Sequence, residues 1–108
     1  MNADAIARLR ARCGGPRDGA LLRFALGQAL LAAGDAAAAA TELRAAVGFD
    51  PHYSAAWKLL GKALQATGAA VAAADAWRSG IAVAEARGDV QAAKEMRVFL
   101  RRNESAPR

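Results

Sequence analysis

Three polar side chains are spaced so that they could bind a ligand together: Lys58, Lys62 and Gln65, at i, i+4 and i+7. In an α-helix this spacing places all three on one face. Lysine ammonium groups attract carboxylates, so the chemistry that this face predicts is non-covalent recognition of an acidic group. The alternative interpretation is that Lys58 and Lys62 are solvated residues of an exposed helix.

Residues for catalysis, metal binding or cofactor binding are not assembled anywhere in the sequence. His52 is the only histidine and follows Pro51 at an expected helix start, while Cys13 is the only cysteine and falls on an apolar stripe. A single histidine without a nucleophile or an acid partner is not a catalytic set. No glycine-rich run precedes Lys-Ser or Lys-Thr, so a phosphate-binding loop is also excluded. We therefore expect no enzyme activity, no catalytic residue, no metal site and no cofactor.

The net charge of +5, from 12 Arg and 3 Lys against 10 acidic residues, is compatible with a nucleic-acid partner. The basic residues are dispersed rather than gathered on one segment, which favours a solvated surface and makes nucleic-acid binding the weaker alternative. One cysteine cannot form an intrachain disulfide, and Met1 to Arg12 lack the apolar stretch of a signal peptide. With no run of 18 apolar residues, no membrane span is expected, and a reducing cytoplasm is the predicted compartment.

A repeat of 34 residues organises the chain. Residues 20–53 align with residues 54–87, and 11 of the 34 pairs are identical, six of them Ala–Ala. A fixed period of this size indicates stacked structural units, which form extended binding surfaces. The other five identities lie at packing and turn positions. They are Leu26/Leu60, Gly27/Gly61, Leu30/Leu64, Gly34/Gly68 and Arg44/Arg78.

The composition and periodicity predict a single all-α domain over residues 1–108. Alanine is the strongest helix former, and β-branched residues are few. Gly34-Asp35 and Gly88-Asp89 combine a helix stop with a helix start, and very short turns force neighbouring helices to be antiparallel. The expected helices are 3–12, 18–33, 36–48, 52–66, 69–86 and 89–102. The expected organisation is an N-terminal helix 3–12, repeat one 20–53, repeat two 54–87, a capping helix 89–102 and a frayed tail 103–108.

At this point the chain resembles the tetratricopeptide repeat family, and in particular its small bacterial single-domain members. The second unit carries the family spacing at Trp57, Leu60-Gly61, Leu64, Ala73, Trp77 and Gly80. The first unit carries it at Leu26-Gly27, Leu30, Ala39, Leu43, Ala46 and Pro51. Small residues at 27, 39, 61 and 73 are expected to bring the two helices of a unit together backbone to backbone. The departures are Arg23 in place of the signature Trp, Leu30 and Leu64 in place of Tyr, and Glu85 in place of Pro.

The resemblance implies a function and a binding face. In such arrays the first helix of each unit lines a concave groove that holds a peptide or protein segment. The groove positions of the family correspond here to Leu21, Phe24, Gln28, Leu31, Ala55, Lys58, Lys62 and Gln65. The expected activity is that of a non-catalytic adaptor for a protein or peptide partner, with a preference for acidic segments. Homodimerisation through Leu21, Phe24 and Leu31 is an alternative, because a two-unit array leaves an apolar edge.

Overall fold

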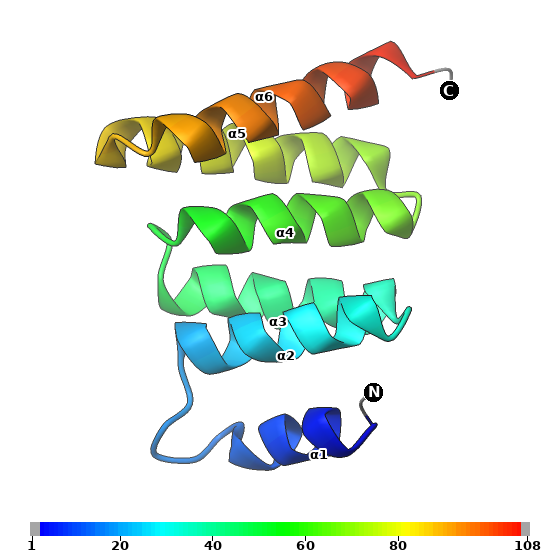
Figure 1. Cartoon of the computed structure of the whole chain (residues 1–108), viewed down its shortest axis with the longest axis vertical. Helices are drawn as coiled ribbons and strands as arrows, with labels where there is room; N and C mark the ends of the chain where they lie inside the picture. The colour runs from blue at the N-terminus through cyan, green and yellow to red at the C-terminus, as the bar shows by residue number, and fades with distance from the viewer. Residues whose placement is uncertain (1–2, 107–108) are drawn as a thin grey trace.

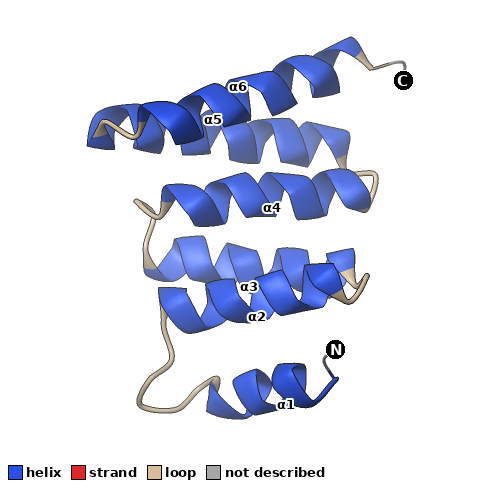
Figure 2. Ribbon diagram, in the orientation of Figure 1, coloured by secondary structure: helices blue, strands red, loops and turns tan. Residues whose placement is uncertain are grey.

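The computed structural model describes residues 3–106, and this part of the chain contains α-helices and no strand (Figures 1 and 2). The all-α fold of antiparallel helix-turn-helix repeats predicted from the sequence is confirmed. The helices are α1 (Ala3–Arg12), α2 (Ala20–Ala32), α3 (Ala36–Phe49), α4 (Ser54–Ala66), α5 (Ala70–Arg87) and α6 (Val90–Ser105).

The helices stack in chain order along the long axis of a molecule of 39 × 31 × 19 Å. In Figure 1, α2, α4 and α6 lie nearer the viewer and α3 and α5 lie behind them. Helix α4 contacts both α2 and α6, so these three helices form one continuous layer. The layer is therefore built from the first helix of each unit, followed by the C-terminal helix.

Tight turns connect α2 to α3 and α5 to α6. Gly34 adopts φ = 88°, a conformation that suits glycine, and the Asp35 side chain then accepts a hydrogen bond from the Ala38 amide at 3.1 Å. The turn before α6 repeats the device, with Gly88 at φ = 75° and Asp89 accepting from the Ala92 amide at 3.2 Å. These are the two Gly-Asp pairs that the sequence analysis used as stop-and-start signals.

Two helix starts lie two residues later than predicted, and those of α5 and α6 lie one residue later. Helix α2 begins at Ala20 rather than 18, because the Asp18 carboxylate accepts from the amides of Gly14 at 2.8 Å and Gly19 at 2.9 Å and holds the loop. Helix α4 begins at Ser54 rather than 52. The Asp50 carboxylate accepts from the His52 amide at 3.0 Å, which forms a turn in place of the first predicted helical residues.

The predicted tail is the third correction. Helix α6 continues to Ser105, so the expectation of a frayed segment from 103 is wrong for residues 103–105, and residues 107 and 108 lie outside the described part. Asn103 is only 3% exposed, and its side-chain Nδ2 donates to Gln65 Oε1 at 2.6 Å and to the Ala70 carbonyl at 2.9 Å. These bonds hold the last turns of α6 against α4 and α5.

The glycines at the repeat positions are covered by large side chains. A Cβ atom on Gly27 would lie 2.6 Å from Cγ of Leu43, and one on Gly61 would lie 2.1 Å from Nε1 of Trp77. Leu43 and Trp77 come from the second helix of the same unit, and both are buried. The expected backbone-to-backbone contact at positions 27 and 61 is therefore wrong, since a bulky side chain fills the space above each glycine.

Candidate functional site

The predicted groove residues of α2 alternate between exposed and half-buried positions. Leu21 is 73% exposed, and Gln28 is also exposed. Phe24 and Leu31 are half-buried, and the Phe24 ring lies 4.9 Å from the Tyr53 ring, centroid to centroid. Burial raises the pKa of the Tyr53 hydroxyl, with a smaller effect of the nearby Asp50 charge. Leu21 and Gln28 are thus the residues of this stripe that a ligand can reach most fully.

Three of the four predicted groove residues of α4 contact α6, one per helical turn, and the fourth, Ala55, is half-buried. Lys58 Nζ donates to Glu95 Oε1 at 2.7 Å, Lys62 Nζ lies 4.9 Å from the centre of the Phe99 ring, and Gln65 Oε1 accepts from Asn103. The hydrogen bond from Lys58 lowers the pKa of Glu95 below its usual range, with help from Gln91. The charge of Lys58 is therefore compensated within the chain, which the sequence analysis did not anticipate.

A hollow of about 260 Å³ lies between α4 and α6, with one buried ring of α5 beneath it. The rings of Trp77 and Phe99 are 5.5 Å apart, centroid to centroid, with 42° between their planes. Trp77 is 3% exposed, and its indole N–H donates to the Lys58 carbonyl at 3.1 Å, which fixes the ring. The hollow is lined by Lys62, Gln65, Trp77, Phe99, Arg102 and Asn103.

Four residues of this hollow were absent from the predicted site. Of the lining residues, the sequence analysis placed only Lys62 and Gln65 in the groove, whereas the buried Trp77 and the exposed Arg102 also line the hollow. Phe99, Arg102 and Asn103 are spaced i, i+3 and i+4 on α6, so they share a helical face. Treating α6 as the first helix of a further unit, and not only as a cap, would have revealed them.

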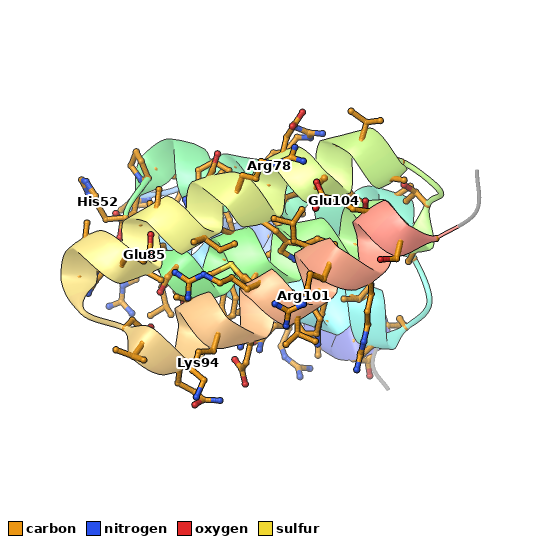
Figure 3. The ribbon with its side chains drawn as sticks, turned by 90° about the horizontal axis from the view of Figure 1, so that it is seen from above. His52, Arg78, Glu85, Lys94, Arg101 and Glu104 are labelled. Atoms are coloured by element: carbon orange, nitrogen blue, oxygen red, sulfur yellow. The ribbon has the colours of Figure 1, made fainter. Side chains whose placement is uncertain are left out.

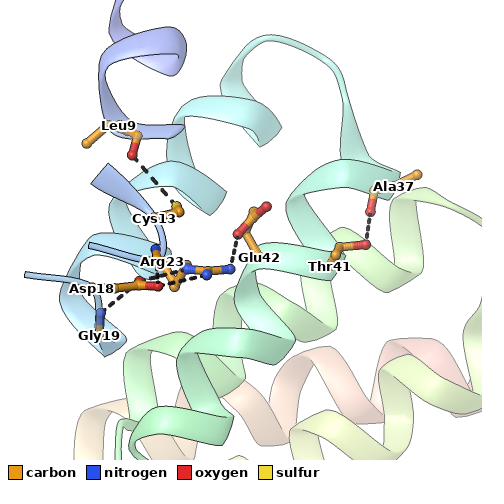
Figure 4. A network of polar contacts seen from close by, with 9 residues as sticks. Leu9, Cys13, Asp18, Gly19, Arg23, Ala37, Thr41 and Glu42 are labelled. Carbon is orange, nitrogen blue, oxygen red and sulfur yellow. Dashed lines mark hydrogen bonds and ion pairs between the residues drawn. The ribbon is translucent and has the colours of Figure 1, made fainter. Parts of the chain in front are cut away.

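A second polar cluster lies away from the hollow, where α2 meets α3 (Figure 4). Arg23 binds the Asp18 carboxylate through Nε and Nη2, both at 2.9 Å, and Glu42 through Nη1 at 3.0 Å. The hydrogen bond to Arg23 holds the pKa of Asp18 well below its usual range, and the same bond raises the pKa of Arg23. Every charge in this cluster has a partner, so its role is to fix the loop before α2.

Cys13 lies beside Arg23 of the second cluster, whereas His52 lies apart from that cluster and from the hollow (Figure 4). The Cys13 side chain is half-buried, and its Sγ contacts the Leu9 carbonyl at 3.7 Å. His52 is exposed, and its backbone carbonyl accepts from Arg87 at 2.6 Å. Within residues 3–106, no three His, Cys, Asp or Glu side chains gather as they would around a metal ion.

Charged residues at the α6 end of the stack are partly paired. Arg78 pairs with Glu104 and Arg97 with Glu85, whereas Lys94 and Arg101 are exposed on α6 (Figure 3).

In the part of the chain that is described, no helix has both the length and the mean hydropathy needed to cross a membrane.

Comparison with known proteins gives similar chains of nearly the same length. No family model matches the sequence. The chain is 56% identical over 89 residues to the TPR repeat-containing protein PA0015 of Pseudomonas aeruginosa. The aligned residues cover 82% of this chain and 85% of that protein.

Solved structures are also similar to this chain over most of its length. Protein BPP2914 from Bordetella parapertussis superposes with a TM-score of 0.80 at 48% identity, over 96% of this chain and 90% of that one. A tetratricopeptide repeat domain protein from Salinibacter ruber gives a TM-score of 0.77 at 27% identity, over 85% and 92% of the two chains.

Proposed function

This chain belongs to the tetratricopeptide repeat family, and from that premise we propose that it is a non-catalytic protein-interaction module that holds a segment of a partner protein. The binding surface is the α2–α4–α6 face, defined by Leu21, Phe24, Gln28 and Leu31 of α2, by Lys62 and Gln65 of α4, and by the hollow beside α6. Lys58 belongs to this face but is engaged by Glu95.

The observation that carries this proposal is the hollow between α4 and α6, which presents an apolar floor and a basic rim. Burial of an apolar side chain supplies most of the affinity of a small interface, and charges at its rim supply selectivity. An acidic partner segment suits the rim. A reducing cytoplasm is part of the same proposal, supported by the single cysteine, and cell fractionation would test it.

Selection from a random-peptide display library tests the proposed function. We expect the immobilised chain to enrich peptides that then bind in solution with low affinity, as is usual for interfaces below about 1,200 Å². The double variant Gln28→Glu/Lys62→Glu, altered on the α2–α4–α6 face, should lose this binding. The control Thr41→Glu/Arg44→Glu carries the same change in net charge on exposed positions of α3 and should retain it.

Two outcomes would contradict the proposal. Peptides that bind both double variants equally well would place the binding surface elsewhere on the molecule. A library that yields no enriched peptide would remove the support for peptide recognition altogether.

Self-association is a second candidate, favoured by the 73% exposure of Leu21. A large apolar side chain that is mostly exposed at the N-terminal end of α2 could pair with its copy across a two-fold axis. Light scattering over a range of concentrations should then show a mass that rises toward a dimer, and Leu21→Glu should keep the chain monomeric. A monomer at all concentrations would exclude it. The nucleic-acid alternative rests on the net charge of +5 alone, and Arg23, Lys58, Arg78 and Arg97 are in ion pairs.

A further inference from the structure

The size of the hollow between α4 and α6 limits what it can hold. Sites for whole small-molecule ligands usually enclose about 300–1,000 Å³. At about 260 Å³ this hollow is smaller, and it opens to solvent between two helices. The rings of Trp77 and Phe99 line its apolar floor, with their centroids 5.5 Å apart. One large side chain from a bound peptide therefore fits the hollow better than a complete metabolite.

The charges at its rim come from two different helices. Lys62 belongs to α4 and Arg102 to α6, and both side chains line the hollow. Within residues 3–106, neither has a carboxylate within ion-pair distance, whereas nearby Lys58 is neutralised by Glu95 at 2.7 Å. The Lys62 ammonium lies over the Phe99 ring, 4.9 Å from its centre, in a cation–π contact. Two cations outside ion-pair distance of every carboxylate in residues 3–106 thus flank a ring-lined hollow.

We propose that this hollow anchors an internal partner segment in which one large apolar residue is flanked on both sides by acidic residues. The apolar side chain lies against Trp77 and Phe99, and the flanking carboxylates face Lys62 and Arg102. This inference rests on the proposed peptide-binding function and specifies the sequence that the α2–α4–α6 face recognises. An internal segment suits the site because acidic side chains on both sides of the apolar residue supply one carboxylate for Lys62 on α4 and one for Arg102 on α6.

Titration by two-dimensional ¹H–¹⁵N NMR tests the proposal directly. The probe is an N-acetylated, C-amidated nonapeptide with a central Glu-Leu-Glu. One comparator carries Gln-Leu-Gln, a second carries Glu-Ala-Glu, and a third ends in Glu-Leu with a free carboxylate. We expect the probe to shift the Trp77 indole N–H signal and the amides of residues 99–103. The first two comparators should bind at least about 5-fold more weakly, and the third no more tightly than the probe.

Charge reversals at the hollow and on the outer face of α6 provide matched variants. Lys62→Glu and Arg102→Glu should each weaken the probe by at least about 5-fold. Lys94→Glu and Arg101→Glu make the same charge change at exposed positions of α6 that do not line the hollow, and should leave binding within about 2-fold. A dispersed spectrum of each free variant shows that it is folded.

Several results would overturn the inference. Equal binding of the Gln-Leu-Gln peptide would remove the charge recognition, and equal binding of the Glu-Ala-Glu peptide would remove the apolar anchor. Tighter binding of the free-carboxylate peptide would assign the hollow to a chain end. Shifts centred on Leu21 and Gln28 would leave the proposed function standing while excluding this hollow. If no peptide binds, the inference fails, and the library selection decides the proposed function independently.

Discussion

Arg23 occupies the position that Trp57 occupies one repeat later, and the two side chains have different polar partners. Trp57 donates its indole N–H to the Pro51 carbonyl at 2.8 Å. Arg23 instead binds Asp18 and Glu42. The sequence shows Arg23 as a departure from the family pattern. The partners of Arg23 are set by the path of the loop before α2, which carries Asp18, and by the packing of α3, which carries Glu42. The sequence alone specifies neither.

The Asp18–Arg23 ion pair predicts a pH dependence of stability. Because the folded-state pKa of Asp18 lies below the value of about 3.9 for an unfolded chain, this carboxylate stabilises the fold at neutral pH. Its contribution is lost as pH falls below about 4. The Asp18→Asn variant should therefore be less stable than wild type at pH 7, and the difference should shrink between about pH 4 and pH 2.

Urea unfolding followed by circular dichroism at each pH measures this difference. The control is Asp75→Asn, because Asp75 pairs with Arg78 at a side chain that is 69% exposed, where an ion pair contributes little. A gap between wild type and Asp18→Asn that stays constant from pH 7 to pH 2 would contradict the assigned role of the Asp18 carboxylate.

Gly61 predicts a destabilising effect of adding one methyl group. In an open helix, Gly→Ala stabilises by up to about 1 kcal/mol. At Gly61 the new Cβ would lie 2.1 Å from Nε1 of Trp77, whose ring is held by the Lys58 carbonyl. The ring must move, and overpacking of this kind costs about 1–3 kcal/mol. We expect Gly61→Ala to lower the free energy of unfolding, measured by urea denaturation.

Gly48 provides the matched control for Gly61. It also lies in a helix, α3, but a Cβ atom there would meet nothing within 4 Å. Gly48→Ala should therefore leave stability unchanged or raise it by up to about 1 kcal/mol. If both alanine variants gain stability, Trp77 is free to move and the close contact with Gly61 does not constrain the fold.

At the scale of helices, the sequence predicted the Gly-Asp turns, but it missed the local hydrogen bonds of Asp18 and Asp50 that delay two helix starts and the tertiary contacts that extend α6. Helix α1 has the predicted bounds, and the Gly34-Asp35 and Gly88-Asp89 turns lie where expected. The C-terminal end of α6 was missed because Asn103 reads as a polar tail residue. Only the positions of Gln65 and Ala70 in space make it a buried hydrogen-bonding residue.

The proposed binding site shows the same division between local pattern and tertiary contact. Helical periodicity was sufficient to place Lys58, Lys62 and Gln65 on one face. It could not show that α6 would pack beside that face, where Glu95 neutralises Lys58 and Phe99 and Arg102 complete a hollow. A face predicted from one helix omits the residues that a neighbouring helix contributes.

The two flanking helices predict different effects of truncation. Helix α6 covers Trp77 and supplies four buried residues, whereas α1 supplies one, Ile6. A chain ending at Gly88 should lose cooperative thermal unfolding and show red-shifted tryptophan fluorescence, because Trp77 becomes exposed. A chain beginning at Gly15 should retain a cooperative transition at a lower temperature. A chain lacking α6 that still unfolds cooperatively would show that α6 is dispensable for the fold.

At the scale of the whole molecule, the 34-residue period predicted the architecture because each unit packs mainly on its sequence neighbours. The stacking order of α1 to α6 along the long axis follows the chain, so local pairing is sufficient to build the array (Figure 1). Helices α1 and α6 cover apolar surface that the two units would otherwise expose at the ends of the stack, because the ends of a repeat array need capping. The fold was therefore more predictable than the site, which depends on contacts between α4, α5 and α6.

A stack of this kind should not be equally stable along its length. Helices α4 and α5 have neighbours on both sides and each contribute six buried residues, whereas α1 packs only on α2. In a nearly one-dimensional array, the ends open before the centre does. Native-state hydrogen exchange should therefore show α1 amides exchanging through local opening, and α4 and α5 amides only through global unfolding. Equal protection of α1 and α5 amides would mean that α1 is coupled to the array more tightly than its single buried residue, Ile6, leads us to expect.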